Sequence, residues 1–253
     1  MTASAPAFAY AGTELDALVE ARNYYRMLVQ RFAPHVGRRV IEVGAGIGTF
    51  AAALLEGTAV DELTLIEPAD NNYPILRDRF VGDPRVRTLP GYLETHASTL
   101  TGDALVAVNV LEHVEDDVAF LRTARGVLAS QGGRLLLFVP ALPALYGTLD
   151  VAFDHYRRYT RRVLNERLVA AGFAPLVLRY VNFPGVLAWF IAGKILRRTT
   201  LTPKAVRLYD RFVLPVAMTL ESVWEPPVGQ SLLAIARPAA SGAAAENARG
   251  RSK

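Results

Sequence analysis

A stretch of eleven residues, Val40-Ile-Glu-Val-Gly-Ala-Gly-Ile-Gly-Thr-Phe50, constrains the fold of this 253-residue chain more than any other. An apolar run at 40–43 leads into glycines at 44, 46 and 48, and small residues with helical character follow. Glycine allows sharp turns and the close approach of a ligand to the backbone. The helix N-terminus behind the loop favours negative charge. The stretch therefore predicts a strand, a ligand-binding turn and a helix.

The rest of the chain continues this alternation. Further strands are predicted at 63–66, 86–89, 104–109, 135–139, 175–181 and 231–236. Helices are predicted at 13–33, 49–56, 72–80, 116–128 and, capped by Thr160, up to Ala171. Alternating strands and helices are typical of an α/β fold with a doubly wound, mostly parallel sheet of the Rossmann-like kind.

Composition narrows the function classes. The chain is 51% hydrophobic, which is ample for a core, and it has no cysteine, which excludes thiolate metal sites and cysteine nucleophiles. The four histidines are scattered in sequence, so no metal site is predicted. A net charge of +4 is a weak argument for nucleic acid and a mild one for an anionic partner.

Three kinds of ligand-binding glycine loop could correspond to residues 40–50. A dinucleotide fingerprint needs glycine at 49, where the chain has Thr49, and a phosphate-binding loop needs a Gly-Lys-Ser/Thr sequence that is absent. The loop resembles the third kind, the E/D-x-G-x-G-x-G loop that binds S-adenosylmethionine, because Glu42 and the three glycines fit without a gap.

Two further segments resemble the same family. Asp103–Glu112, followed by His113, is similar to a fourth-strand segment that often ends in Leu-Glu-His, and Gly132–Pro140 is similar to the fifth strand with its Gly-Gly entry. From Tyr24 to Arg237 the chain resembles a class I S-adenosylmethionine-dependent methyltransferase of the bacterial type 11, 12 or 23 subgroup. The resemblance implies a seven-stranded sheet whose last strand is antiparallel, with a helical insertion before that strand.

The resemblance and the composition together divide the chain. We expect a flexible N-terminus at 1–12, a methyltransferase domain at 13–237 with a helical insertion or lid at 183–227, and a disordered tail at 238–253.

The resemblance also implies S-adenosylmethionine as the cofactor, with Glu67 at the end of the second strand holding the ribose hydroxyls. A carboxylate suits this role because it accepts two O–H donors at once. The third strand departs from the family pattern, since Gly91-Tyr92 stands where an acid usually meets the adenine. The predicted cofactor-binding residues are Tyr24, Glu42, Gly44, Gly46, Gly48, Glu67, Pro68, Gly91, Tyr92, Asn109 and Leu111.

On the acceptor side, transfer to a hydroxyl needs a base, and His155 and then His113 are the candidates because both can titrate near neutral pH. The segment around His155 is similar to the HYRRYT stretch of the subgroup, so Tyr156, Arg157, Arg158 and Tyr159 are predicted to bind the substrate. Two alternatives remain open. His113 could serve the cofactor side or cap a helix, and Arg157 or Arg158 could pair with Asp150 or Asp154.

The predicted reaction is methyl transfer to a small-molecule or lipid-linked acceptor, most simply at oxygen. A nicotinamide-dependent oxidoreductase is the first alternative, although the chain lacks a Tyr-x-x-x-Lys pair, and a non-catalytic partner protein of the same fold is the second. No nucleic-acid substrate is expected, because there is no basic stripe and no motif for a flipped base. The oligomeric state is left open.

The insertion allows two interpretations. Residues 183–220 either pack as helices on the sheet or form an amphipathic hairpin that contacts anionic headgroups through Arg197, Arg198, Lys204 and Arg207. The sequence shows no signal-peptide pattern and no apolar run long enough to span a bilayer. We therefore expect a cytoplasmic protein, with membrane association through 183–220 as the second interpretation.

Overall fold

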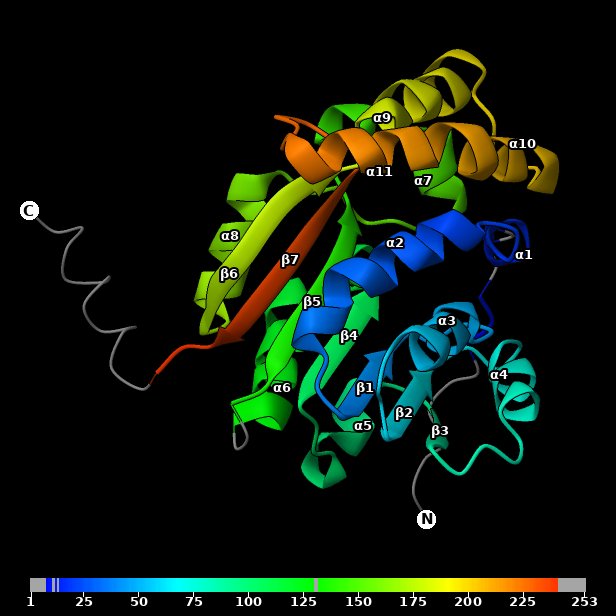
Figure 1. Ribbon diagram of the computed structural model, residues 1–253. Helices are drawn as coiled ribbons and strands as arrows, with labels where there is room; N and C mark the ends of the chain where they lie inside the picture. Colours follow the sequence, from blue (N-terminus) through cyan, green and yellow to red (C-terminus); the bar gives the residue numbers. More distant parts are fainter. Residues whose placement is uncertain (1–7, 11, 13, 130–131, 241–253) are drawn as a thin grey trace, which may run out of the picture.

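The computed structural model describes residues 8–10, 12, 14–129 and 132–240. The remaining parts of the predicted flexible N-terminus and disordered tail, residues 1–7, 11 and 241–253, lie outside the described residues. The described residues form one seven-stranded sheet in the order β3-β2-β1-β4-β5-β7-β6 (Figure 1). The strands are β1(Arg39–Val43), β2(Glu62–Glu67), β3(Val86–Pro90), β4(Ala104–Val108), β5(Arg134–Pro140), β6(Phe173–Val181) and β7(Ser231–Pro238).

The strand pairing confirms the predicted sheet. β1 to β5 pair in parallel, whereas β7 lies antiparallel between β5 and β6, with Leu137 opposite Ala234 and Tyr180 opposite Leu232. The central strands β4 and β5 read as nearly continuous apolar runs because helices cover both faces of the sheet there. The edge strand β3 is only partly buried.

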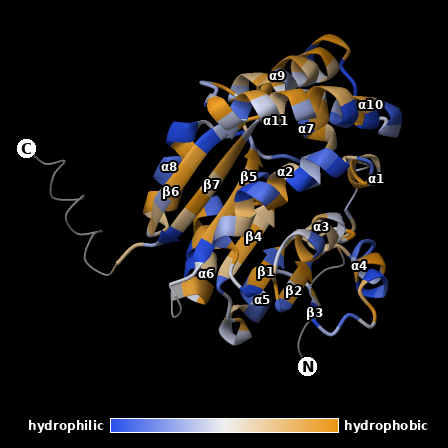
Figure 2. Ribbon diagram, in the orientation of Figure 1, coloured by the Kyte–Doolittle hydropathy of each residue, from blue (hydrophilic) through white to orange (hydrophobic). Residues whose placement is uncertain are grey.

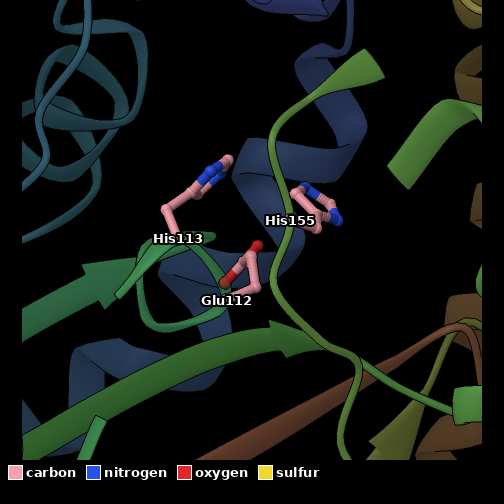
Figure 3. Close-up of side chains that lie close together, drawn as sticks. All are labelled: Glu112, His113 and His155. Atoms are coloured by element: carbon pink, nitrogen blue, oxygen red, sulfur yellow. The ribbon is translucent and has the colours of Figure 1, made fainter. Parts of the chain in front are cut away.

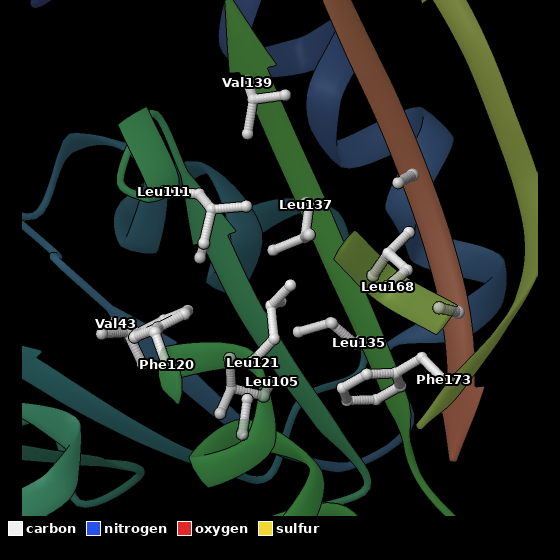
Figure 4. Packing of buried hydrophobic residues seen from close by; sticks show 14 of the residues in the cluster. Val43, Leu105, Leu111, Phe120, Leu121, Leu135, Leu137, Val139, Leu168 and Phe173 are labelled. Carbon is white, nitrogen blue, oxygen red and sulfur yellow. The ribbon is translucent and has the colours of Figure 1, made fainter. Parts of the chain in front are cut away.

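Helices form a layer on each face. α5(Leu93–His96), α6(Asp117–Ala129) and α8(Arg161–Ala170) cover one face, where Phe120 and Leu121 pack against Leu105 and Leu135 (Figure 4). α2(Arg22–Phe32), α3(Thr49–Gly57), α4(Tyr73–Arg79) and α11(Leu214–Val223) cover the other. Figure 2 shows the resulting apolar strands between helices of mixed character. Both faces of the central strands β1, β4 and β5 therefore pack against helices.

The strand order reverses between β1 and β4. The chain runs outward from β1 to β2 and β3, and then returns to β4 on the other side of β1. In such sheets, ligands bind beside the carboxyl ends of the strands at this reversal. The glycine loop follows β1, and Asn109 follows β4, so both lie at the reversal point.

The insertion forms a group of helices, here called the cap, over the carboxyl ends of the parallel strands (Figure 1). The cap comprises α9(Phe183–Trp189), a π-helix η5(Phe190–Ile195), α10(Pro203–Leu208), a second π-helix η6(Tyr209–Val213) and α11. The short helices α1(Glu14–Leu18) and α7(Thr148–Ala152) lie beside the cap. The described residues also include the 3₁₀ turns η1(Ala33–His35), η2(Ala97–Thr99), η3(Leu111–His113) and η4(Pro143–Leu145).

The helix predicted at 13–33 is divided. α1 ends at Leu18 and α2 begins at Arg22, with Ala21 out of helical conformation at ψ 60°. Two N–H groups of the first turn of α2 donate to the carboxylate of Asp210 in the cap, Asn23 N at 3.0 Å and Tyr24 N at 2.8 Å. The periodicity is helical on both sides of the break, and a tertiary contact decides where the second helix starts.

Candidate functional site

The glycine loop is pinned to the end of β2. Gly44 N and Ala45 N donate to the carbonyl of Ile66 at 2.8 and 3.1 Å. Gly44 has φ +68°, and a Cβ atom there would lie 2.5 Å from Cγ2 of Val110. Gly46 has φ +56° and donates its N–H to Oε2 of Glu67 at 2.7 Å. The loop therefore needs glycine both for its backbone conformation and for its close approach to the segment after β4.

Two buried carboxyl groups lie beside this loop. Glu67 also accepts from Ala69 N at 3.0 Å; burial raises its pKa, and its hydrogen bonds with Ala69 and Gly46 oppose the rise. Glu42 is only 3% exposed, and among the described residues no group donates to its Oε2. Burial, with the neighbouring charge of Glu67, raises the pKa of Glu42 to about 8. Both groups thus keep acceptor capacity for a ligand.

Tyr24 and Asn109 join α2 to the end of β4. Asn109 Nδ2 donates to the hydroxyl of Tyr24 at 3.0 Å, and Asn109 itself has φ +53°, which asparagine tolerates better than most residues. Burial raises the pKa of Tyr24 above its usual range, so the hydroxyl is neutral and available for hydrogen bonding.

A cavity of about 1320 Å³ runs from the glycine loop to the underside of the cap. It brings together most of the predicted cofactor side and part of the predicted acceptor side. The predicted residues that line it are Tyr24, Glu42, Gly44, Gly46, Glu67, Pro68, Asn109, His113, His155, Tyr156 and Arg158. Gly48, Gly91, Tyr92, Leu111, Arg157 and Tyr159 do not line this cavity.

The acceptor side is built around Asp150, which is fully buried in α7. Its Oδ1 accepts from Nδ1 of His155 at 3.0 Å and from Nε of Arg158 at 2.6 Å, and its Oδ2 accepts from Nε1 of Trp189 at 3.3 Å. Burial works against ionisation of Asp150, but the hydrogen bonds from His155 and Arg158 outweigh it and hold the pKa of Asp150 below its usual range. An ionised carboxylate only accepts, so Nδ1 of His155 carries the proton.

His113 and Glu112 complete this end of the cavity. The His113 and His155 rings meet edge to face with centroids 4.8 Å apart, and the carboxylate of Glu112 points toward the space between them (Figure 3). Burial, followed by the charge of His155, lowers the pKa of His113 to about 4. Burial raises the pKa of Glu112 to about 7, and the charges of His155 and Arg158 limit the rise. At neutral pH His113 is therefore uncharged.

Two residues of the predicted substrate segment pack instead. Tyr159 is fully buried and donates to the carbonyl of Leu111 and to Asp117, each at 3.1 Å. Arg157 pairs with the same Asp117 at 3.2 Å and donates to the carbonyl of Glu115 at 2.7 Å. These contacts tie the segment to the start of α6. The pairing left open at the sequence level is Arg158 with Asp150.

Sequence reasoning missed Glu112 and Trp189 as members of the site. Glu112 belongs to the Leu-Glu-His pattern but has no role assigned from the sequence, and Trp189 lies in the predicted insertion, far along the chain from the HYRRYT stretch. Asp150 was considered only as an arginine partner. The signal that unites them is spatial, because η3, α7 and α9 meet only in the folded chain.

The chain matches a known protein family. Residues 18–178 match a family model described as a methyltransferase domain. The chain belongs to this methyltransferase family. The match confirms the family predicted from the sequence, and with it S-adenosylmethionine as the cofactor to be expected.

Among curated proteins, a malonyl-[acyl-carrier protein] O-methyltransferase of Bacteroides fragilis (strain 638R) is 30% identical over 112 residues. The similarity covers 44% of this chain and 22% of that protein, so it spans less than a quarter of the relative's length.

Solved structures share the fold. A methyltransferase of Haloferax volcanii, solved in complex with the Trm112 methyltransferase activator, superposes with a TM-score of 0.61 at 14% identity and covers 91% of this chain and 96% of its own. Phosphoethanolamine N-methyltransferase 2 of Haemonchus contortus, in complex with S-adenosyl-L-methionine, gives a TM-score of 0.55 at 16% identity, covering 87% of this chain and 53% of its own.

Proposed function

We propose that the protein transfers a methyl group from S-adenosylmethionine to an oxygen atom of a small-molecule or lipid-linked acceptor. One observation carries the proposal: a single cavity joins the glycine loop of a methyltransferase fold to a pair of histidines under an apolar cap. The similarity to an O-methyltransferase supports oxygen as the acceptor atom.

The residues around the loop fit the cofactor. When bound, S-adenosylmethionine supplies a methyl group on a positively charged sulfur atom. Glu67 offers carboxylate lone pairs to the ribose hydroxyls, and the orphaned oxygen of Glu42 offers an acceptor to the amino group of the methionine part. Two of the loop glycines, Gly44 and Gly46, complete the proposed binding wall together with Pro68, Tyr24 and Asn109.

His155 is the proposed base, with His113 beside it. Asp150 holds Nδ1 of His155, which leaves Nε2 of the same ring as the proton acceptor. Tyr146 donates to the carbonyl of His155 at 2.7 Å and fixes the backbone there. Asp150 acts as a positioning residue in this scheme, and Arg158, which it also holds, faces the cavity.

The cap supports a lipid-linked acceptor. Among the described residues, more than half of the exposed large apolar side chains belong to the segment from α9 to Trp224. They are Phe183, Leu187, Phe190, Ile191, Ile195, Leu196, Leu208, Phe212, Val216, Leu220, Val223 and Trp224. Exposed cations, including Arg197, Arg198 and Lys204, lie among them. Within the described part of the chain, no helix has both the length and the apolar character needed to cross a bilayer, so the proposed contact is with the surface of an anionic membrane.

Calorimetric titration with S-adenosylhomocysteine, with NADH in parallel, tests the cofactor assignment. We expect binding of the first compound alone. Glu67→Ala should weaken it by about 1–3 kcal/mol, the range for hydrogen bonds to a charged group. Glu62→Ala, on the exposed start of the same strand, is the matched control and should leave the affinity unchanged.

Each contrary result has its own meaning. Binding of NADH alone would support the oxidoreductase alternative, and binding of neither compound would support the non-catalytic alternative. Unchanged affinity in Glu67→Ala would remove Glu67 from the ribose site.

For the base, His155→Ala should lose transfer of labelled methyl groups to extracted lipids and small molecules while keeping its affinity for S-adenosylhomocysteine. Equal transfer in that variant would end the role of His155.

A further inference from the structure

Three side chains with metal-ligating atoms converge at one end of the cavity. Glu112 and His113 come from η3, and His155 comes from the segment after α7, 42 residues further along the chain. One ligand atom from each lies within 4.8 Å of the other two. Figure 3 shows the carboxylate of Glu112 directed to the space between the two imidazole rings. Two imidazoles and one carboxylate form a recurrent donor set for transition-metal ions.

Glu112 is the observation that points to a ligand. Its side chain is 0% exposed, and among the described residues no other residue donates a hydrogen bond to either carboxylate oxygen. A buried carboxylate without partners is costly to keep, so its lone pairs call for a bound group. Asp150 is already paired with Arg158 at 2.6 Å, so the carboxylate of Glu112 is the group whose charge a bound cation would balance.

The carboxylate of Asp150 orients the imidazole of His155 for coordination. Asp150 accepts from Nδ1 of His155 at 3.0 Å and thereby leaves Nε2 as the lone-pair atom. Histidine ligands of metals almost always donate their other ring N–H to a carboxylate or a backbone carbonyl. The arrangement at His155 matches this pattern.

We propose that Glu112, His113 and His155 bind one divalent transition-metal ion, of the class of Zn²⁺ or Fe²⁺, at the acceptor end of the cavity. Bond lengths of about 2.0–2.2 Å place tetrahedral ligand atoms about 3.4 Å apart. Side-chain rotations that move each ligand atom by about 1 Å would therefore bring the three atoms to coordination distance. Two imidazole nitrogens disfavour Mg²⁺, which prefers oxygen ligands. Three protein ligands leave coordination positions open toward the cavity.

The use of this ion rests on the proposed function. An ion at this position would hold an oxygen atom of the acceptor and lower the pKa of a coordinated hydroxyl. It would thus take over the activation assigned above to Nε2 of His155, which becomes a ligand. The existence of the site does not depend on methyl transfer, so it is tested by metal binding itself.

The test uses the full chain without a histidine tag, stripped with chelator and titrated with Co²⁺, whose visible absorption reports coordination, and with Zn²⁺ in equilibrium dialysis. We expect one equivalent bound per chain and no comparable binding of Mg²⁺. Glu112→Gln and His113→Asn should each lose the absorption. His35→Asn, in η1 and outside the cluster, is the matched control and should keep it.

Asp150→Asn tests the orienting contact and should weaken Co²⁺ binding by about 10–100-fold. Thermal unfolding of each variant shows that it is folded. A folded wild type that binds no Co²⁺, or binding that survives in both ligand variants, overturns the proposal. Titration with S-adenosylhomocysteine on the same samples separates the two hypotheses. Binding of S-adenosylhomocysteine without binding of metal contradicts the metal site alone. Binding of metal without binding of S-adenosylhomocysteine contradicts the proposed function alone.

Discussion

Buried carboxyl groups dominate the site at the scale of single residues. Glu42 and Glu112 are both almost or fully inaccessible. Among the described residues, no other residue donates a hydrogen bond to one carboxylate oxygen of Glu42 or to either carboxylate oxygen of Glu112. Folding alone does not favour such groups, because desolvation of a carboxylate without partners costs free energy. Both side chains line the same cavity, so ligands bound there can supply the missing hydrogen-bond donors or a cation.

This arrangement predicts a pH-dependent stability of the ligand-free protein. Glu42 has a pKa of about 8 in the folded chain, well above its usual value of 4.5. The native state therefore holds a proton that the unfolded chain releases, and stability present below pH 4.5 is lost as the pH rises toward 8. His113, with a pKa lowered to about 4, acts in the opposite sense between pH 4 and 6.5. Above pH 6.5 the glutamate effect remains alone.

Urea unfolding between pH 6.5 and 8 measures this effect. The free energy of unfolding should fall by up to about 1.4 kcal/mol per pH unit for each buried glutamic acid. Glu42→Gln should reduce the slope, and Glu62→Gln, on an exposed residue, should leave it unchanged. An identical slope in Glu42→Gln would show that Glu42 is already ionised in the folded protein.

The residue scale also shows what the sequence could and could not reveal. The loop from Glu42 to Gly48 and Glu67 could be predicted, because their spacing is local and their backbone requirements are specific to glycine. The meeting of Glu112, Asp150 and His155 could not, because it depends on how η3 and α7 pack. Tyr159 was predicted to bind substrate because its segment resembles the HYRRYT stretch of the subgroup, yet its ring packs in the core beneath α6.

At the scale of secondary-structure elements, one contact links the cap to the cofactor side. The N-cap residue of α2 is Ala21, which has no side-chain acceptor for the first helical N–H groups. Asp210 of η6 supplies the missing acceptor to Asn23 N and Tyr24 N, and its carbonyl accepts from Nδ2 of Asn23 at 2.9 Å. The N-terminus of α2, the helix that carries Tyr24, is therefore stabilised by a residue of the cap.

Removal of this acceptor should affect both elements together. We expect Asp210→Ala to cost about 1–2 kcal/mol of stability, as for loss of a helix N-cap. Hydrogen exchange should accelerate at the start of α2 and across α10 and α11, and slow exchange in β1 and β4 should persist. Asp78→Ala, on the exposed surface of α4, is the control. Exchange rates in α10 and α11 that match the wild type would mean that other contacts hold the cap.

At the scale of the whole molecule, the cap gives the protein two different surfaces. The strand and helix layers bury their apolar faces on each other, whereas the cap leaves apolar side chains in water (Figure 2). The sequence predicted the sheet well, since buried parallel strands read as continuous apolar runs. It left the cap undecided, because helices that are apolar on several sides fit both a core and a membrane surface.

Sedimentation with lipid vesicles tests the proposed membrane contact. We expect the protein to bind vesicles that contain phosphatidylglycerol and to bind pure phosphatidylcholine more weakly, with added salt reducing the difference. Replacing Ile195 and Leu196 together by Glu should weaken binding by about tenfold or more, because two exposed apolar side chains no longer leave water. Val81→Glu, distant from the cap, should bind as the wild type does. Equal binding of the double variant would exclude the cap as the contact surface.

The position of β7 has a consequence for how the protein is made. β7 comes after β6 and is the last of the described strands, yet it lies inside the sheet between β5 and β6. During synthesis, residues 1–230 leave the ribosome with β5 and β6 both waiting for their shared neighbour, and only the strand at 231–238 can close that half of the sheet. The nascent chain therefore exposes two unpaired strand edges until β7 has emerged, and during this interval aggregation and chaperone binding compete with folding.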